Sequence, residues 1–260
     1  MDIRLDGRTA LVTGGSLGLG RAMAHRFAEA GAKVAIVARR QEVLDEAKAE
    51  IEAATGGTVG AYACDIREAA EIEALFAKVA GELGPVDILV NNAGTSNAKP
   101  FMEVSDAEWQ EDLDLKLFGA IRCVRQAMPG MIERKWGRII NVVSIQAKAQ
   151  GPASTPTSVS RAAGMALTKA LAGEGGPHGV LVNAMLVGWF KTDQFIRRHQ
   201  SVAPEKSFEE YMQPWISRIP VRRIGDPFEF ANMACFLASD AASYINGTAI
   251  NMDGGASPVV

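Results

Sequence analysis

Between Thr13 and Gly20 the chain reads TGGSLGLG, a run of small residues that can bind an anion through its backbone. Glycines there permit a tight turn and let backbone N–H groups approach a pyrophosphate, and the start of the following helix favours negative charge. An apolar run precedes the loop and a second one follows at Lys33 to Ala38, so the loop joins a strand–helix–strand unit. This pattern predicts dinucleotide binding, the alternative being a glycine-rich turn without a ligand. The expected contacts are Gly14, Ser16, Leu17, Gly18, Leu19 and Gly20.

Two arginines, Arg39 and Arg40, follow the second apolar run, where dinucleotide-binding proteins often carry an acid for the ribose 2′-hydroxyl. A guanidinium group can instead bind a 2′-phosphate through two parallel hydrogen bonds. We therefore expect NADP(H) to be preferred, with NAD(H) as the alternative coenzyme. The other interpretation of these arginines is a solvated basic start to the next helix.

Short Val, Ile and Leu runs alternate with stretches of helical period from residue 9 to residue 252, which is typical of a parallel sheet. The pattern predicts an α/β fold, a single-domain Rossmann-type doubly wound sheet of seven mainly parallel strands with helices on both faces. The expected strands are 9–13, 33–38, 58–64, 87–91, 138–144, 180–186 and 248–252. The expected helices are 22–30, 42–54, 68–82, 105–134, 156–172 and 227–238.

Only residues 189–220 interrupt this alternation, and we expect them to form a substrate lid of short helices within one domain spanning 1–260. The segment is rich in aromatic and basic side chains. An apolar pocket with basic anchors would suit an acidic or acyl substrate, and the alternative is that the charges keep a mobile lid soluble. The aromatic residues are Trp189, Phe190, Phe195, Phe208, Tyr211 and Trp215, and the basic ones are Arg197, Arg198 and Lys206.

The overall charge argues against polyanionic partners. Lys and Arg total 27 and Asp and Glu total 30, so the net charge of −3 leaves no overall positive balance for nucleic-acid phosphates or anionic lipid. No secretory signal and no apolar run long enough to span a membrane is present. We expect no nucleic-acid partner, no membrane partner and a cytoplasmic location.

Neither the cysteines nor the histidines have the spacing of a disulfide framework or a metal site. We therefore expect reduced thiols and no bound metal. The cysteines are Cys64, Cys123 and Cys235, and the histidines are His25, His178 and His199.

Taken together, the motifs resemble those of the short-chain dehydrogenase/reductase superfamily over nearly the whole chain. Beside the glycine loop they comprise Asp65, NNAG at 91–94, GRIIN at 137–141 leading to Ser144, GDP at 225–227, FLASD at 236–240 and DGG at 253–255. The resemblance implies a small-molecule carbonyl or alcohol substrate and a homotetramer. It also implies coenzyme contacts from Asp65 and Ile66 near the adenine, from Asn92, Ala93 and Gly94 beside the ribose, and from Gly188 and Thr192 near the nicotinamide.

The resemblance further implies a catalytic Ser, a Tyr separated from it by twelve residues, a Lys four positions beyond the Tyr, and an Asn on the preceding long helix. Ser144 matches the Ser. The other three positions fall on Thr157, Arg161 and Lys116. The loss of the Tyr does not depend on the alignment, because no tyrosine lies between residues 63 and 210.

These replacements change which side chain can donate a proton to a developing alkoxide. Thr157 is a very poor acid, and Arg161 keeps its proton but can stabilise an oxyanion or hold the ribose. Burial and the like charge of Arg161 would lower the pKa of Lys116 toward neutrality. We expect Lys116 to deliver the proton while Ser144 and Thr157 orient the substrate oxygen.

Structural interpretations of the same residues stay open. Thr155 could cap a helix whose first residue is Pro156, with Thr157 and Arg161 on one helix face, and Lys116 could be a lysine that extends its amine to solvent. Three functions therefore remain: an NADP(H)-dependent oxidoreductase with an atypical proton donor, a nucleotide-binding partner subunit or sensor without turnover, and a non-redox enzyme on the same fold. Halohydrin dehalogenases resemble this chain in having Arg at the Lys position.

Overall fold

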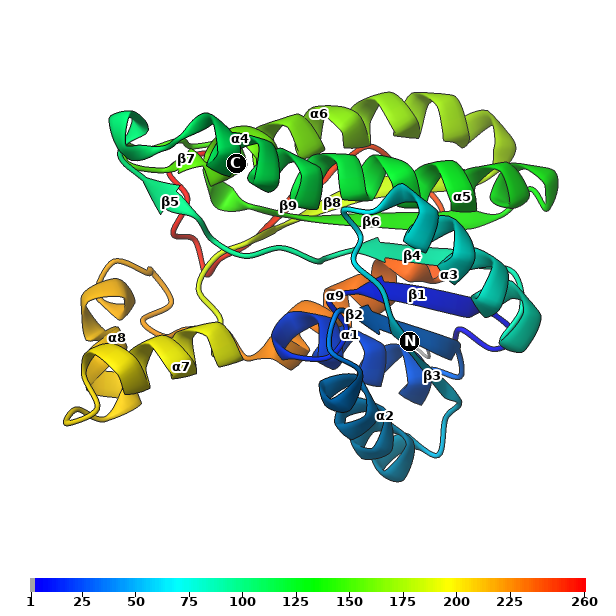
Figure 1. Cartoon of the computed structure of the whole chain (residues 1–260), viewed down its shortest axis with the longest axis horizontal. Coiled ribbons are helices and arrows are strands. Elements are labelled where there is room, and N and C mark those ends of the chain that lie inside the picture. The colour runs from blue at the N-terminus through cyan, green and yellow to red at the C-terminus, as the bar shows by residue number, and fades with distance from the viewer. Residues whose placement is uncertain (1–2) are drawn as a thin grey trace.

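The centre of the molecule is a seven-stranded sheet with the order β3-β2-β1-β4-β6-β8-β9, in which every neighbouring pair is parallel (Figure 1). The computed structural model describes residues 3–260. The strands are β1 (Thr9–Thr13), β2 (Lys33–Ala38), β3 (Val59–Ala63), β4 (Ile88–Asn91), β6 (Gly137–Ser144), β8 (Val180–Val187) and β9 (Ala249–Met252). The predicted fold class is confirmed, and each end of each predicted strand agrees to within one residue.

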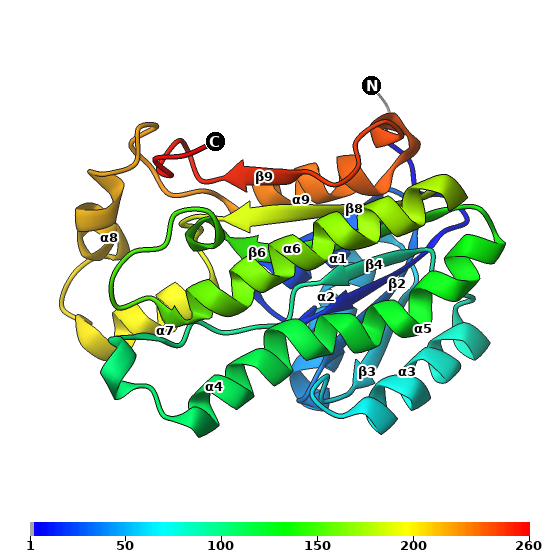
Figure 2. The ribbon, with the colours of Figure 1, turned by 90° about the horizontal axis from the view of Figure 1, so that it is seen from above.

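Helices cover both faces of the sheet (Figure 2). Val12 of β1 packs with Met23 and Phe27 on one face, whereas Leu11 packs with Ile72 on the other, because successive strand residues point to opposite faces. The first face carries α1 (Gly18–Glu29), α2 (Gln41–Thr55) and α9 (Pro227–Ala238). The second carries α3 (Ala69–Glu82), α4 (Asp106–Leu113), α5 (Gly119–Glu133) and α6 (Thr157–Gly175). Strands buried on both faces explain the continuous apolar runs of the sequence.

The predicted helix over 105–134 is three segments. A π-helical turn, η2 (Asp114–Phe118), separates α4 from α5. The helix N-terminus expected at Thr155 is wrong, because Thr155 and Pro156 form β7 (Thr155–Pro156), which pairs antiparallel with β5 (Ala98–Lys99). The hydroxyl of Thr155 donates to the carbonyl oxygen of Lys99 rather than capping α6. The 3₁₀ turns are η1 (Phe101–Glu103), η3 (Ile145–Ala147), η4 (Gly176–His178) and η5 (Asp240–Ala242).

The carboxyl ends of the strands meet at one edge of the sheet, where β1 lies between β2 and β4 and the chain order reverses. Crevices at such switch points bind ligands in open α/β sheets. The segment predicted as a lid forms α7 (Asp193–Val202) and α8 (Phe208–Ile216), which project beside this edge (Figure 1). Tyr211 and Met212 anchor a small apolar cluster of their own there.

None of the helices in residues 3–260 is both long and apolar enough to cross a membrane. Within the same residues no three His, Cys, Asp or Glu side chains are grouped as metal ligands would be. All three cysteines are buried with free thiols.

Candidate active site

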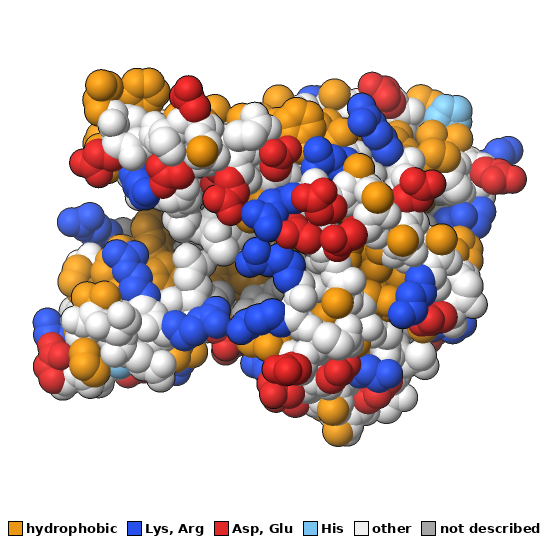
Figure 3. Space-filling view, viewed as in Figure 1, with side chains coloured by type: hydrophobic (Ala, Val, Ile, Leu, Met, Phe, Trp, Pro, Cys, Tyr) orange, Lys and Arg blue, Asp and Glu red, His pale blue; other side chains and the backbone are white. Residues whose placement is uncertain are grey.

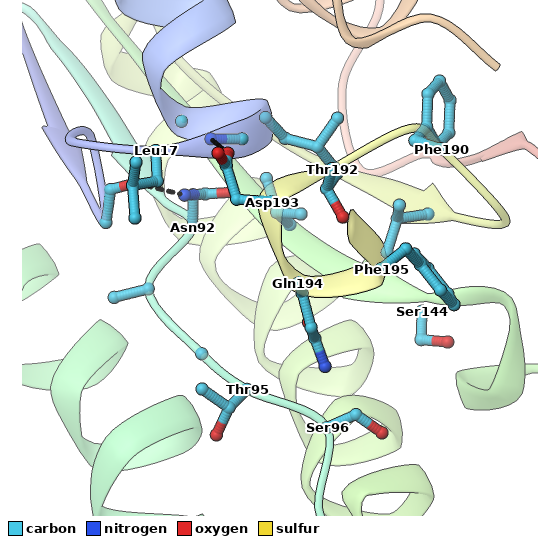
Figure 4. A pocket seen from close by; sticks show the side chains of 18 of the residues that line it. Leu17, Asn92, Thr95, Ser96, Ser144, Phe190, Thr192, Asp193, Gln194 and Phe195 are labelled. Carbon is cyan, nitrogen blue, oxygen red and sulfur yellow. Dashed lines mark hydrogen bonds between the residues drawn. The ribbon is translucent and has the colours of Figure 1, made fainter. Parts of the chain in front are cut away.

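A cavity of about 960 Å³ opens at the carboxyl edge of the sheet, between the glycine loop, the segment after β4, the end of β6 and the start of α7 (Figure 4). Lys and Arg side chains gather beside the hollow that separates the α7–α8 projection from the rest of the molecule (Figure 3). The charged side chains that line the cavity are Arg39, Arg40, Arg161, Asp193, Arg197 and Arg198. Five cations against one carboxylate make the cavity suited to an anionic ligand.

Most of the residues predicted to bind the coenzyme line this one cavity. They are Gly14, Ser16, Leu17, Gly18, Leu19, Gly20, Arg39, Arg40, Asn92, Ala93, Gly94, Gly188 and Thr192. Asp65 and Ile66 do not line it. Asp65 accepts hydrogen bonds from the guanidinium of Arg67, which lowers the pKa of its carboxyl, with a smaller contribution from Arg39. Asp65 thus lies near the Arg39 side of the cavity without forming its wall.

Close packing explains the glycines of the loop. A Cβ on Gly20 would stand 2.0 Å from the carbonyl oxygen of Gly14, and Gly14 itself has a φ of +65°. Thr13 ties the loop to the end of β4, because its hydroxyl oxygen accepts from the backbone N–H of Asn92 at 2.9 Å and of Ala93 at 3.0 Å. The loop is therefore held rigidly with its backbone facing the cavity.

The first residue of α7 holds the same loop, a contact that the sequence did not suggest. The carboxylate of Asp193 accepts from the backbone N–H of Gly18 at 2.8 Å, and both residues line the cavity (Figure 4). Leu17, at the N-cap of α1, makes no side-chain hydrogen bond to the helix, and Asp193, 175 residues beyond Gly18, provides the cap instead. A carboxylate at a helix N-terminus is favourable.

The loop and its surroundings fit the diphosphate and 2′-phosphate of NADP(H). Gly14 to Gly20 leave no side chain between the backbone and the ligand at the glycine positions, and Arg39 and Arg40 are exposed on the wall next to the carboxyl end of β2. Within residues 3–260, no carboxylate lines the wall beside these two arginines to bind a free ribose 2′-hydroxyl.

Among the predicted catalytic residues, Ser144, Thr157 and Arg161 line the cavity and Lys116 does not. Ser144 ends β6 and Thr157 begins α6, so the sheet edge and a helix start bring them to one wall. Arg161, one turn beyond Thr157, donates to the carbonyl oxygen of Val142 at 2.6 Å. Its guanidinium lies against Gly94, where a Cβ would stand 2.6 Å from Nη2.

Lys116 lies directly behind Thr157. Its side chain is 1% exposed, and its Nζ donates to Oγ1 of Thr157 at 2.9 Å and to Oδ1 of Asp112. Asp112 is 3% exposed, and its other oxygen accepts from the hydroxyl of Ser160 at 2.6 Å. The prediction that Lys116 could extend to solvent is wrong, because the π-helical turn directs it inward against α6.

Burial and, to a smaller extent, the positive charge of Arg161 together lower the pKa of Lys116 to about 8, although Asp112 opposes both. Burial likewise lowers the pKa of Arg161 to about 10, again opposed by Asp112. The two predicted causes for Lys116, desolvation and a like charge, both act. With two cations and one carboxylate, this cluster has a net positive charge beside the cavity wall.

Three residues near Thr157 and Lys116 were not predicted from the sequence: Asp112, Ser160 and Asn97. The backbone N–H of Asn97 donates to Oγ1 of Thr157 at 2.9 Å. Asp112 had a detectable signal, because it stands four residues before Lys116 on a predicted helix, the spacing of an ion pair. Asn97 and Asp193 had none, since their partners lie far away in the sequence.

The fold and the cavity together define a nucleotide-binding α/β protein of Rossmann type, with the candidate catalytic residues Ser144, Thr157 and Arg161 lining a cavity at the carboxyl edge of the sheet. Residues 14–257 match the family described as Enoyl-(Acyl carrier protein) reductase. The chain belongs to this family of the short-chain dehydrogenase/reductase superfamily.

Named relatives span the full chain. It is 34% identical to 3-oxoacyl-(acyl-carrier-protein) reductase of Aquifex aeolicus, over 98% of this chain and 99% of that one. It is 36% identical to acetoacetyl-CoA reductase of Shinella zoogloeoides, over 95% of this chain and 98% of that one. The structure of L-sorbose reductase from Gluconobacter frateurii, complexed with NADPH and L-sorbose, covers 100% of both chains with a TM-score of 0.96 and 33% identity. These relatives are reductases acting on carbonyl compounds.

Proposed function

We propose that the protein is an NADP(H)-dependent oxidoreductase that interconverts a carbonyl compound and an alcohol, with Thr157 and Lys116 supplying the proton. The observation that carries the proposal is the hydrogen bond from Lys116 to Thr157 at the wall of the cavity that also contains the glycine loop. The carbonyl and alcohol chemistry of the named relatives supports the reaction type.

NADP(H), when bound, supplies or removes the hydride. The glycine loop and Asn92 to Gly94 would hold its diphosphate and ribose, Arg39 and Arg40 its 2′-phosphate, and Gly188 and Thr192 its nicotinamide end. A homolog complexed with NADPH and the two arginines support the phosphorylated coenzyme. NAD(H) remains the alternative coenzyme.

The protein must provide the proton, and Thr157 is placed to hand it over. A hydroxyl oxygen accepts two hydrogen bonds, and both acceptor directions of Oγ1 are taken, by Nζ of Lys116 and by the N–H of Asn97. The hydroxyl hydrogen of Thr157 is therefore left to donate to another oxygen, and the cavity is where it can do so. Thr157 passes its proton to the substrate oxygen and takes one from Lys116.

Arg161 and Ser144 complete the wall around the reacting oxygen. Arg161 remains protonated at neutral pH even with its lowered pKa, so it stabilises negative charge without moving a proton. Ser144 accepts a hydrogen bond from the backbone N–H of Gln146 at 3.2 Å, which leaves its own hydrogen available to the substrate. In this proposal Thr157, Arg161 and Lys116 replace the Tyr, Lys and Asn that the family resemblance implies.

The test compares Thr157→Val, which removes the hydroxyl at nearly constant volume, with Thr157→Ser, which keeps it. NADPH binding is measured by the fluorescence of the reduced nicotinamide, and turnover by its absorbance with a panel of ketones. We expect unchanged NADPH affinity in both variants, a loss of about 10²- to 10⁴-fold in kcat for the valine and near-complete rescue by the serine.

Full turnover of Thr157→Val would overturn the proton route. NADPH binding by the wild type without turnover of any carbonyl or alcohol would favour a sensor or partner subunit. Absence of any nucleotide binding would favour a non-redox enzyme on this fold. The lid role of residues 189–220, the homotetramer and the cytoplasmic location stay predictions.

A further inference from the structure

The part of the cavity beyond Ser144 and Thr157 carries polar groups that the proton route does not use. Thr95, Ser96, Gln146 and Gln194 line it, and none of their side chains makes a hydrogen bond to another residue within 3–260. In Figure 4 the amide of Gln194 points across the cavity toward the segment that holds Thr95 and Ser96. These neutral donors and acceptors come from three separate elements and face one space.

Aromatic side chains also line the same cavity. Trp189 and Trp215 line it together with Phe195, and the two tryptophans are only partly buried. Flat apolar rings offer a surface for the C–H face of a ligand, while the hydroxyl and amide groups can bind its oxygens. A ligand that matches both must carry several neutral oxygens on a carbon skeleton.

From this lining we infer that the substrate is a neutral polyhydroxylated carbonyl compound, such as an open-chain ketose, and its product the corresponding polyol. The inference rests on the proposed function, because reduction adds a hydride from the coenzyme to the carbonyl carbon and a proton, from Lys116 through Thr157, to the oxygen. The hydride that NADPH would supply carries both electrons of the reduction, and the polyol gains that hydride and one proton.

An acyl chain fits this region poorly. An apolar chain packed against Thr95, Ser96, Gln146 and Gln194 would take their polar groups from water without replacing the lost hydrogen bonds. A site built to bind hydroxyl groups therefore rejects an analogue that lacks them far more strongly than an apolar site rejects an added hydroxyl. Arg197 and Arg198 also line the cavity, and like Thr95, Ser96 and Gln194 they are exposed. Water and salt screen the long-range attraction of these two arginines for a substrate carboxylate, whereas hydrogen bonds from the neutral groups act only at contact.

The test uses D-fructose and 2-hexanone, six-carbon compounds that as open-chain 2-ketones differ only in hydroxylation, with acetoacetyl-CoA as the acyl thioester. NADPH oxidation gives kcat/KM for each. We expect D-fructose to exceed the other two by at least about tenfold. Gln194→Leu and Gln146→Leu, which keep the side-chain volume, should each lower kcat/KM for D-fructose about tenfold or more and leave 2-hexanone unchanged or improved. Gln213→Leu, an exposed position on α8 outside the cavity, is the matched control.

A second readout does not depend on turnover. Calorimetric titration of D-fructose into the complex with NADP⁺ should show binding that Gln194→Leu weakens and Gln213→Leu does not. A higher kcat/KM for acetoacetyl-CoA or 2-hexanone overturns the substrate class and leaves the oxidoreductase in place. Binding of D-fructose without turnover of any carbonyl supports the substrate class and overturns the proposed reaction. If D-fructose does not bind and no carbonyl is turned over, both proposals are overturned.

Discussion

Lys116 has a side chain that is only 1% exposed, and its charge depends on its immediate neighbours. Burial and Arg161 favour the neutral amine, and the carboxylate of Asp112 favours the ammonium. The result is a pKa of about 8, which lies close enough to neutrality for proton transfer in either direction. Ser160 keeps Asp112 in place by donating to its second oxygen. The chemistry of the site therefore depends on a positioning residue, Asp112, that does not line the cavity.

We expect kcat for carbonyl reduction to be constant below this pKa and to fall as the pH rises through about 8, because Lys116 then has no proton to give. Alcohol oxidation needs the neutral amine and should rise over the same range. Steady-state rates from pH 6 to pH 10 measure both. Lys116→Met should lower kcat about 10²- to 10⁴-fold and abolish this pH dependence. If Lys116→Met keeps the same fall in kcat near pH 8, another group must cause that pH dependence.

Replacing one partner of the buried Asp112–Lys116 ion pair should lower the free energy of unfolding more than replacing both. Lys116→Met leaves the carboxylate of Asp112 buried and without its cation, which should lower the free energy of unfolding by about 3–5 kcal/mol. Asp112→Leu alone leaves Lys116 beside Arg161 and should be similarly destabilising. Urea unfolding of both single variants and the double variant measures the coupling. Strictly additive effects would show that the two side chains do not stabilise each other.

Two irregular segments, a π-helical turn and the glycine loop before α1, shape the site. The π-helical turn Asp114–Phe118 interrupts the long predicted helix at Lys116, and such turns often occur at functional sites. The glycine loop at the start of α1 is the other, where the chain passes so close to itself that no side chain fits. At the π-helical turn the helical period of the sequence continues, so the sequence predicts one unbroken helix over 105–134 and does not reveal the irregularity.

Gly20→Ala tests the loop as an element. The new methyl group would collide with the carbonyl of Gly14, so the backbone facing the cavity must move. We expect NADPH affinity to fall by at least about tenfold and the free energy of unfolding to fall by about 1–3 kcal/mol. The control is Gly173→Ala on α6, where a Cβ meets nothing within 4 Å. That change should stabilise the protein by about 0.5–1 kcal/mol without altering NADPH affinity.

Equal NADPH affinity in Gly20→Ala and the wild type would show that the loop does not contact the coenzyme. Fluorescence titration and urea unfolding on the same samples separate that outcome from simple misfolding.

On the scale of the whole molecule, the cavity joins parts of the chain that are distant in sequence. Its walls come from the first βα unit, the segments after β4 and β6, the start of α6 and the α7–α8 projection. Asp193 connects that projection to the glycine loop. A ligand that contacts all of these parts stabilises the entire fold, because it binds only when they are assembled.

NADPH at a hundred times its Kd should therefore raise the free energy of unfolding by about 2.7 kcal/mol and Tm by roughly 5–10 °C. NADH at the same concentration should raise Tm less, because it has no 2′-phosphate for Arg39 and Arg40. Scanning calorimetry measures both shifts. The double variant Arg39→Ala/Arg40→Ala should abolish the difference, whereas Arg218→Ala, exposed and outside the cavity, should retain it. A difference that survives in the double variant would place the 2′-phosphate elsewhere.

Much of this architecture was predictable because its causes are local. Apolar runs of four to eight residues define buried parallel strands, and a glycine run between a strand and a helix defines the loop, so the sheet and most of the cavity wall followed. Asp65 and Ile66 do not line the cavity, and their contacts with the coenzyme stay predictions, because a position implied by resemblance does not say which side chain forms the wall.

By itself, the sequence determined the seven-stranded α/β fold, the glycine loop and the presence of Ser144, Thr157, Arg161 and Lys116 near one edge of the sheet. Only the tertiary structure decided that Lys116 lies behind Thr157, paired with Asp112, instead of in the cavity. Lys116 and Thr157 are 41 residues apart, and Gly18 and Asp193 are 175 apart. Hydrogen-bond partners over such separations depend on how whole elements pack against one another, whereas strand and helix patterns depend on neighbours along the chain.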